Sequence, residues 1–502
     1  MKLRRYLVHV MMLLMLLLLA VGSVLQSHIG LADNGDFSRL HPWVSSGPVG
    51  FAENWPEEGS EAYGLRFYNN VLAYWKLDMP FTSRWVSSVL LLWLPGVLLN
   101  ALLHSSSVLY LPWIAVGARV AVLVFFFLLL HSLRKHAGGM APWYMLLIGV
   151  PFILMMLDTH YSAYLVSFYQ EPASVVGLLA VLLAIGRYYG EEDSRWRPWV
   201  VMAALLFLTT AKLSNVHWGV LAGALLVPWG LWRTQRSRLA VHVLLLIVVP
   251  SAIPVLQGSV YGTRFVNAYQ SVFCGSLTFS EQPGTHLRRL GVPEASRYIG
   301  FHGYSAMGED CMRRYPELMT HRVTASMILH EPSIAWRMLT FAADSMQRSE
   351  VRHLSKQLLY NEGGDRDRWR RVAPPVAASG DVFTTWSRFK EALLPRGGGL
   401  LAMLALAILL GAVGMRDQRR LTRVLSAAML LLAVGALADM WMQIFGDGRR
   451  DLLKHLYLAN VCVDGVLMLL PAWLLAIVSQ RGLLRRRRHW SDEWRHSGGS
   501  LS

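Results

Sequence analysis

The stretch YLVHVMMLLMLLLLAVGSVLQ at residues 6–26 decides the fold class, because it is long and apolar enough to cross a bilayer as one helix. The basic residues Lys2, Arg4 and Arg5 precede it, and Gly30-Leu31-Ala32 follows it, as in a signal peptide with its cleavage site. The apolar core is longer than a signal peptide needs, so we expect a membrane helix. With either interpretation, the chain that follows emerges on the outer side of the membrane.

Comparable apolar runs recur along the chain. Of its 502 residues, 54% are hydrophobic and only 16% are charged. This composition predicts an all-α polytopic membrane protein and excludes an ordinary soluble domain. By the length criterion we expect about ten spans, at residues 6–26, 108–132, 143–157, 172–189, 197–212, 216–232, 239–256, 398–415, 424–445 and 459–479.

The basic residues indicate how the spans are oriented. The formal net charge is +16, but Lys and Arg cluster in short segments between spans and in the tail at 481–502, which contains Arg485 to Arg488. Such clusters are typical of cytoplasmic segments, so the charge does not indicate nucleic-acid binding. Both termini are therefore expected in the cytoplasm.

One apolar run, Val86 to Leu103, breaks this charge rule if it is counted as a span, because one of the two basic termini would then lie outside. We therefore expect 83–104 to form a helix in the outer interface, bent at Pro95. The alternative, a true span with an unrecognised eleventh partner, stays open.

These assignments divide the chain into four parts. Residues 1–256 form an N-terminal transmembrane module with a first outer loop at 27–107, and residues 257–397 form a small, mainly helical outer domain. Residues 398–480 hold the last membrane helices, and 481–502 form the basic tail. Asp365-Arg366-Asp367-Arg368 and Pro374-Pro375 indicate a mobile stretch within the outer domain.

The cysteines exclude one kind of site and suggest a cross-link. Only Cys274, Cys311 and Cys462 occur, without a CxxC pair, so a zinc or iron–sulfur site is not indicated. Cys274 and Cys311 both fall in the outer domain, where an oxidising compartment favours a disulfide. Two separate buried thiols are the alternative. Cys462 falls in a span and is expected to stay reduced.

Polar residues gather on the outer side, where several spans end. They lie in Asp33-Asn34-Gly35-Asp36-Phe37, in the segment ending at Glu171, in the turn Lys212 to Asn215, and between Gly446 and His455. Singly, such residues are often helix caps, turns or interfacial anchors. Together, carboxylates, lysines and a histidine at one membrane surface predict a pocket for an anionic, membrane-borne substrate.

These blocks resemble, in order and spacing, those of bacterial membrane glycan hexose transferases within the GT-C glycosyltransferase superfamily. The resemblance runs from about residue 30 to 470 through short motifs. They are Asp33 to Arg39, Ser167 to Ala173, Ala211 to Asn215, and a last block that consists of Gly446-Asp447-Gly448 with Asp451 to Leu456 and Asn460. The last block is the most specific. It implies a GT-C-like fold with an interfacial helix in the first outer loop and an acidic residue of that loop acting at the acceptor. It also implies a sugar donor linked to polyprenyl phosphate.

The chemistry of such a transfer assigns roles to these residues. A base must accept the proton of the acceptor hydroxyl, and cations must hold the phosphate leaving group. We expect Asp36 to be the base, with Asp33 as its partner and Glu171 as the alternative acid. Lys454, His455 and Lys212 are candidates for the phosphate. Further substrate-binding candidates in the motifs are Arg39, Tyr169, Asn215 and Asp447.

The sequence leaves the role of a metal open, because Asp33 and Asp36 can serve either a proton or a divalent cation such as Mg²⁺ or Mn²⁺. We expect hexose transfer to a cell-surface glycan or lipid-linked acceptor at the outer face of a bacterial inner membrane. A transporter or flippase of a lipid-linked glycan is the alternative, although the chain shows no internal repeat. A non-catalytic lipid-binding scaffold would not need acidic clusters at several span ends.

Overall fold

A computed structural model describes residues 2–26, 29–49, 71–190, 197–233, 247–258, 264–346, 354–358, 382–449 and 452–497. Most of these residues are helical. The helices of the main bundle are α1 (Lys2–Leu25), α4 (Val89–Leu103), α5 (Val116–Ala137), α6 (Ala141–Tyr144), α7 (Val150–Leu157), α9 (Glu171–Gly190), α10 (Arg197–Ala211), α11 (His217–Arg233), α13 (Val249–Gly258), α23 (Gly398–Gly414), α24 (Arg420–Asp447) and α26 (Tyr457–Ser497).

Within the described residues, four stretches are long and apolar enough to cross a membrane: Tyr6–Leu25, Leu111–Leu157, Arg420–Asp447 and Tyr457–Ser479. The second has 47 residues, or about 70 Å of continuous helix, more than twice the hydrocarbon thickness. It folds back instead. Gly138 has a φ of +53°, and the rings of Phe126 and Phe152 stack with their centroids 4.7 Å apart. The stretch is therefore a hairpin of two helices, as the separate spans at 108–132 and 143–157 predict.

The described residues contain a fifth candidate span only if α22 (Thr385–Leu393) and α23 are counted together as one span. These two helices meet at an angle of 92°. Glu171–Gly186 and Trp199–Ala211 are shorter apolar helices at two of the predicted spans. The predicted spans 216–232 and 239–256 have side chains or segments outside the described residues. The structure thus shows a mainly helical integral membrane protein, and the number of ten spans stays a prediction.

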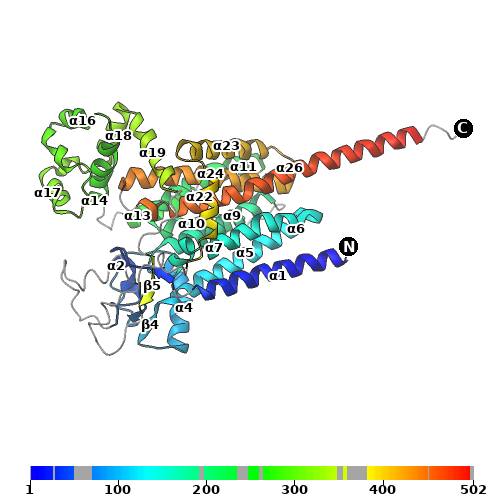
Figure 1. The fold of residues 1–502 in the computed structure, drawn as a ribbon, viewed down its shortest axis with the longest axis horizontal. Coiled ribbons are helices and arrows are strands. Elements are labelled where there is room, and N and C mark those ends of the chain that lie inside the picture. The colour runs from blue at the N-terminus through cyan, green and yellow to red at the C-terminus, as the bar shows by residue number, and fades with distance from the viewer. Residues whose placement is uncertain are drawn as a thin grey trace.

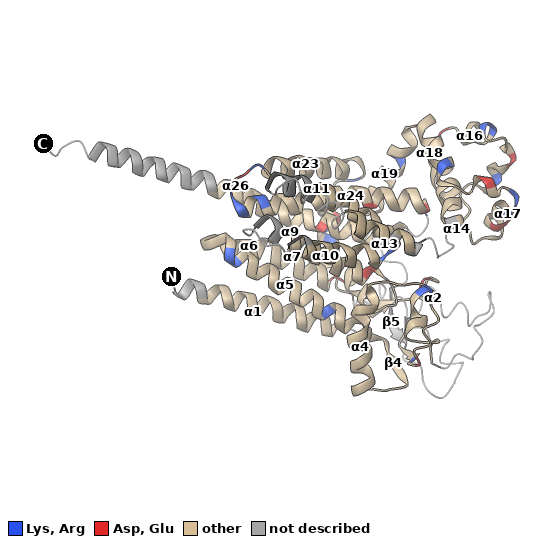
Figure 2. Cartoon of the chain, turned by 180° about the vertical axis from the view of Figure 1, so that it is seen from behind, with Lys and Arg blue, Asp and Glu red and all other residues tan. Residues whose placement is uncertain are grey.

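The long helices lie side by side, and the two ends of the bundle differ (Figure 1). The start of α1 and the end of α26 lie at one end, while the strands and the helices α14 to α19 lie at the other. Lys and Arg lie beside α6 and α26 at the first end, and also on α2 and around α16 to α18 at the other end (Figure 2).

Helix α4 runs crosswise to α1 and α5 near the end of the bundle that carries the strands (Figures 1 and 2). It packs closely on the start of α5, because a Cβ on Gly96 would lie 1.8 Å from the carbonyl oxygen of Trp113 and one on Gly117 2.0 Å from that of Leu92. Its other face exposes leucines, namely Leu91, Leu94, Leu98, Leu102 and Leu103. A crosswise helix with one packed and one exposed apolar face fits the expected interfacial helix better than a span.

The outer segment is mainly helical in its described part, as predicted, with α14 (Arg264–Tyr269), α15 (Leu277–Phe279), α16 (Pro283–Arg289), α17 (Ala306–Arg314), α18 (His321–His330) and α19 (Ser333–Ser345). It also contributes a strand to the first outer loop. Strand β5 (Leu354–Leu358) lies between β1 (Ile29–Leu31), to which it is antiparallel, and β2 (Val71–Leu72), to which it is parallel. The predicted mobile stretch at 365–375 lies outside the described residues.

A second small sheet closes the first outer loop. Strand β3 (Tyr74–Lys76) pairs antiparallel with β4 (Val108–Tyr110), and Trp75 faces Leu109 in the register. Because β4 leads directly into the turn before α5, this pairing holds the loop against the start of the helical hairpin. The loop is thus tied down at both of its described ends.

The predicted disulfide between Cys274 and Cys311 is wrong in this structure, because both residues are buried thiols. Cys274 lies in a π-helical segment, η9 (Gln270–Ser276), and its Sγ lies 3.0 Å from the carbonyl oxygen of Phe301. Cys311 lies on the buried face of α17. Both thiols are free, and the pairing predicted from compartment alone does not form. Cys462 is likewise a buried thiol.

Candidate functional site

The first outer loop turns sharply at Asp33, and this turn sets the direction of Asp36. The Oδ1 atom of the buried Asp33 accepts hydrogen bonds from the backbone N–H groups of Gly35, at 2.7 Å, and Phe37, at 3.0 Å. Gly35 has a φ of +101°, which favours glycine. Asp33 therefore organises the backbone from which the short helix α2 (Phe37–Leu40) starts.

Asp36, immediately before α2, pairs with two cations. Its Oδ1 lies 3.0 Å from Nη2 of Arg39, one turn along α2, and its Oδ2 accepts a hydrogen bond from Nζ of Lys454. Burial acts to raise the pKa of Asp36, but Lys454 and Arg39 outweigh it and hold this pKa well below its ordinary value. Asp36 is thus a carboxylate at neutral pH.

Tyr169 contacts both Lys454 and the backbone that precedes Asp36. Its hydroxyl donates to the carbonyl oxygen of Ala32 at 2.8 Å and accepts from the N–H of Asn34 at 3.1 Å. Nζ of Lys454 lies 4.7 Å from the centre of the ring. Burial, together with the charges of Asp33 and Asp36, raises the pKa of Tyr169 well above its ordinary value, so the phenol stays protonated. The tyrosine therefore joins the turn at Asp33 to Phe37 to Lys454.

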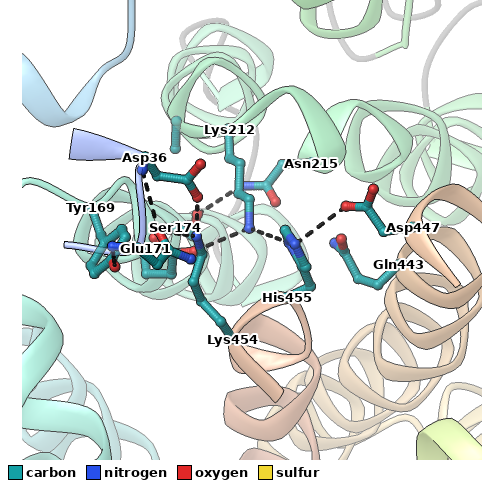
Figure 3. A network of polar contacts seen from close by, with 12 residues as sticks. Asp36, Tyr169, Glu171, Ser174, Lys212, Asn215, Gln443, Asp447, Lys454 and His455 are labelled. Carbon is teal, nitrogen blue, oxygen red and sulfur yellow. Dashed lines mark hydrogen bonds and ion pairs between the residues drawn. The ribbon is translucent and has the colours of Figure 1, made fainter. Parts of the chain in front are cut away.

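A second chain of polar contacts lies beside the first (Figure 3). Nζ of Lys212 donates to Oε1 of Glu171 at 3.0 Å and lies 3.4 Å from Nδ1 of His455. The other ring nitrogen of His455, Nε2, lies 3.2 Å from Oδ2 of Asp447. Glu171 starts α9, where the helix dipole favours a negative charge. Lys212 lies at the break between α10 and α11, which frees its side chain from helical packing.

Lys454 and His455 come from one short helix, α25 (Leu452–His455), between α24 and α26. Adjacent residues on a helix point in different directions, so Lys454 reaches Asp36 while His455 reaches Lys212 and Asp447. The element thus joins the two chains of contacts into one site. Burial, and then the charges of Lys212 and Lys454, lower the pKa of His455 well below its ordinary value, so its ring is neutral.

A family model described as the YfdI N-terminal transmembrane domain matches residues 2–492 of this chain. The chain belongs to this family. No curated protein and no solved structure shows a significant match to it. The match covers nearly all of the described bundle and the whole site, so the site is part of the YfdI-type domain itself and not of an appended module.

Most residues that the sequence predicted for the site meet in this YfdI-type domain, but two of the predicted roles do not fit. The side-chain N–H₂ of the buried Asn215 donates to Oγ of Ser174 at 2.8 Å and to the carbonyl oxygen of Leu208 at 3.0 Å. It therefore joins α9 to α10 and does not face a substrate. Asp33 likewise serves the backbone, as described above.

The arrangement also does not fit the predicted divalent cation at Asp33 and Asp36. Asp33 directs one oxygen to backbone N–H groups. Asp36 faces two positive side chains, which would repel a divalent metal ion. Among the described residues, no group of three or more His, Cys, Asp and Glu side chains lies in a metal-binding arrangement. No step of the chemistry below depends on a metal.

Sequence reasoning missed a second charged cluster, whose two charged side chains, Lys390 and Asp464, are buried. Nζ of Lys390, on α22, lies 3.0 Å from Oδ1 of Asp464 on α26 and donates to Oδ1 of Asn460 at 3.1 Å. The hydroxyl of Tyr161 donates to Asp464 as well. Asp464 lies within a predicted span, and an ionisable residue there is itself a signal of a partnered or functional site. Asp158 completes the docking of α22 by accepting from the N–H of Ser387 at 2.8 Å.

Proposed function

We propose that this protein is a membrane glycosyltransferase of the GT-C type that moves a hexose from a polyprenyl-phosphate donor to a glycan or lipid-linked acceptor. The observation that carries the proposal is the pairing of Asp36 with Lys454 of α25. The neighbouring residue of α25, His455, contacts Lys212, so a second lysine lies beside this pair. A carboxylate and two lysines at one end of an apolar bundle provide a base and the cations for a lipid phosphate.

In the proposed reaction the acceptor oxygen attacks the anomeric carbon of the hexose. The bond between that carbon and the phosphate oxygen breaks, and the polyprenyl phosphate leaves with the bonding electron pair. The proton of the acceptor hydroxyl passes to the carboxylate of Asp36, while Lys454 and Lys212 stabilise the charge on the phosphate.

Lys454 links donor binding to the strength of the base. In the structure its ammonium group neutralises Asp36, which makes that carboxylate a weak base. A donor phosphate that draws Lys454 to itself weakens this pairing, so the proton affinity of Asp36 rises when the donor is in place. The acceptor is then deprotonated only beside a bound donor.

The proposed location is a bacterial inner membrane, with the termini in the cytoplasm and the site on the outer face. The basic residues near α6 and α26 support this orientation (Figure 2). The site lies at the opposite end, where α2 and β5 mark the outer loops (Figure 1). A polyprenyl-linked donor is anchored in the membrane, so a site at the bundle end places the reacting phosphate at headgroup level.

The test measures transfer of labelled hexose from polyprenyl phosphate by the purified protein in proteoliposomes. We expect Asp36→Asn to insert normally and to lower transfer by about two to four orders of magnitude. Glu309→Gln, which removes an exposed carboxylate of the outer domain, is the matched control and should keep full activity. An Asp36→Asn rate above about a third of the wild-type rate would contradict the role of Asp36 as a base.

A transporter or flippase is the second candidate, and one observation favours it: the buried Lys390–Asp464 pair places charges within the helical bundle. The same vesicles distinguish the two functions. A flippase moves the labelled donor across the bilayer without forming a glycosylated product, whereas a transferase forms the product when the donor faces the site.

A further inference from the structure

Both ring nitrogens of His455 are engaged, and their partners define one protonation state. Nδ1 lies 3.4 Å from Nζ of Lys212, and Nε2 lies 3.2 Å from Oδ2 of Asp447. An ammonium group only donates hydrogen bonds and a carboxylate only accepts them. Nδ1 must therefore accept from Lys212, and Nε2 must carry the proton that it donates to Asp447. Only the neutral ring with its proton on Nε2 satisfies both contacts.

Lys212 depends on this ring for its direction. A lysine side chain is long and flexible, so fixing its ammonium group needs acceptors on more than one side. Glu171 supplies one from α9 at 3.0 Å, and His455 supplies the other from α25. The three side chains point toward one another in Figure 3. Without the second acceptor, Lys212 is tethered only to Glu171.

We propose that His455 is a positioning residue that aims Lys212 at the phosphate of the lipid donor, and that it is neither a ligand of the phosphate nor a proton donor. This inference rests on the proposed function and deepens it. To donate to a phosphate, Nε2–H would have to leave Asp447, which is largely buried. The lowered pKa of the ring supports the same division of roles, because it keeps the imidazolium form unpopulated at neutral pH.

Two substitutions separate the functions of the two nitrogens. The amide of Asn reaches the place of Nδ1 and can still accept from Lys212, whereas the amide of Gln reaches the place of Nε2 and can only replace the contact to Asp447. We expect His455→Gln to weaken binding of polyprenyl phosphate by about ten- to a hundredfold, the usual cost of losing a hydrogen bond to a charged group. His455→Asn should stay close to wild type.

The measurement is the Kd of polyprenyl phosphate, without a sugar, for protein in nanodiscs, so it does not depend on transfer. Lys212→Met provides the matched background, in which the Asn and Gln variants should bind equally. Thermal unfolding of each variant checks that the fold is kept. Equal losses in both variants on the wild-type background, or a Gln variant that binds better than the Asn variant, would overturn the inference.

A spectroscopic arm tests the protonation state itself. In protein labelled with ¹⁵N-histidine, the difference between wild type and His455→Asn should show one neutral ring protonated at Nε2. The signal should be unchanged between about pH 7 and 8, because burial raises the pKa of Asp447 to about 6 and leaves it a carboxylate in this range. A signal that titrates in this range would refute a neutral positioning role. If the histidine and binding results hold but no sugar is transferred by the wild type, the proposed function fails while the lipid-phosphate site stands.

Discussion

At Gly448 both the backbone conformation and the space around the residue disfavour a side chain. Its φ is +61°, and a Cβ there would lie 2.6 Å from the carbonyl carbon and oxygen of Cys274. The next residue, Arg449, donates its N–H to the same carbonyl oxygen at 3.1 Å. Its guanidinium also lies 4.7 Å from the ring centre of Phe341. The Gly-Asp-Gly motif thus joins the end of α24, and with it Asp447, to the outer domain.

We expect Gly448→Ala to destabilise the protein by at least about 1–2 kcal/mol, the cost of a left-handed backbone at a residue with a Cβ, with the clash at Cys274 in addition. Thermal unfolding in detergent measures the loss. Gly446→Ala is the matched control from the same motif, because its added Cβ meets nothing within 4 Å. Equal melting temperatures for the two variants would contradict this account.

The charge balance at Asp36 predicts a change in pH dependence. The folded-state pKa of Asp36 is depressed, so the stabilisation from its ion pairs is present above its unfolded pKa of about 3.9 and is lost as the pH falls through the folded value. The kcat/KM of wild-type transfer, which reports the free enzyme, should therefore show no acid limb from Asp36 above about pH 4. In Lys454→Met, burial is opposed mainly by Arg39, and the pKa rises.

We therefore expect the acid limb of kcat/KM for Lys454→Met to move to higher pH, in addition to a lower maximal value. The profile is measured between about pH 4 and 8, where kcat/KM reports groups of the free enzyme. Lys76→Met, at a lysine of the same outer loop, should leave the profile unchanged. An unshifted limb would mean that Lys454 does not control the protonation of Asp36.

At the scale of elements, α22 is attached to the bundle by a buried ion pair as well as by apolar packing of the buried Trp386. Phe389 and Leu393 are exposed, while Lys390 points inward to Asp464. Asp158 and Thr159 hold the start of the helix through the N–H groups of Ser387 and Phe383. Polar contacts at the start of this amphipathic helix and at Lys390 therefore fix its position on the bundle.

Removal of one partner should leave the other charge buried and uncompensated, at a cost of about 3–5 kcal/mol. We expect Lys390→Met and Asp464→Leu each to be strongly destabilising, and the double variant to recover much of the loss. A thermodynamic cycle from equilibrium unfolding of the four proteins gives the coupling energy. Additive losses would show that the two side chains act independently.

At the scale of the whole molecule, the two ends of the bundle predict two sides of the membrane. Ser106 and Gly139 are exposed and lie between α4 and β4 and between α5 and α6, respectively. The connection between α4 and β4 lies at the end of the bundle with the strands, and the connection between α5 and α6 at the end with the termini (Figure 1). Single cysteines are placed at these positions in a background without Cys274, Cys311 and Cys462. We expect an impermeant thiol reagent to label Ser106→Cys in intact spheroplasts.

Gly139→Cys should be labelled only after the membrane is broken. The reverse pattern would place the site in the cytoplasm and would contradict transfer on the outer face. Labelling of both positions only after breakage would show that α4 and its turn do not lie at the outer surface.

The sequence by itself determined the class of protein, several of its long apolar helices and the residue types of the site. These properties are local: a span is read from a contiguous apolar run, its orientation from the nearby Lys and Arg, and a candidate residue from its place at a span end. The apolar helix within 83–104, observed as α4, was accessible for the same reason. Asp464 was accessible too, since an acid within an apolar run is visible without any structure.

Only the tertiary structure decided which of these residues meet. Lys454 and Asp36 are 418 positions apart and Lys212 and His455 are 243 apart, and no local pattern specifies such contacts. The same limit explains the errors: Cys274 and Cys311 share a compartment but pack within different elements, and Asp33 and Asn215 have the right chemistry but serve the backbone and a helix junction. Side-chain direction follows from how the helices pack, and packing is a property of the whole chain.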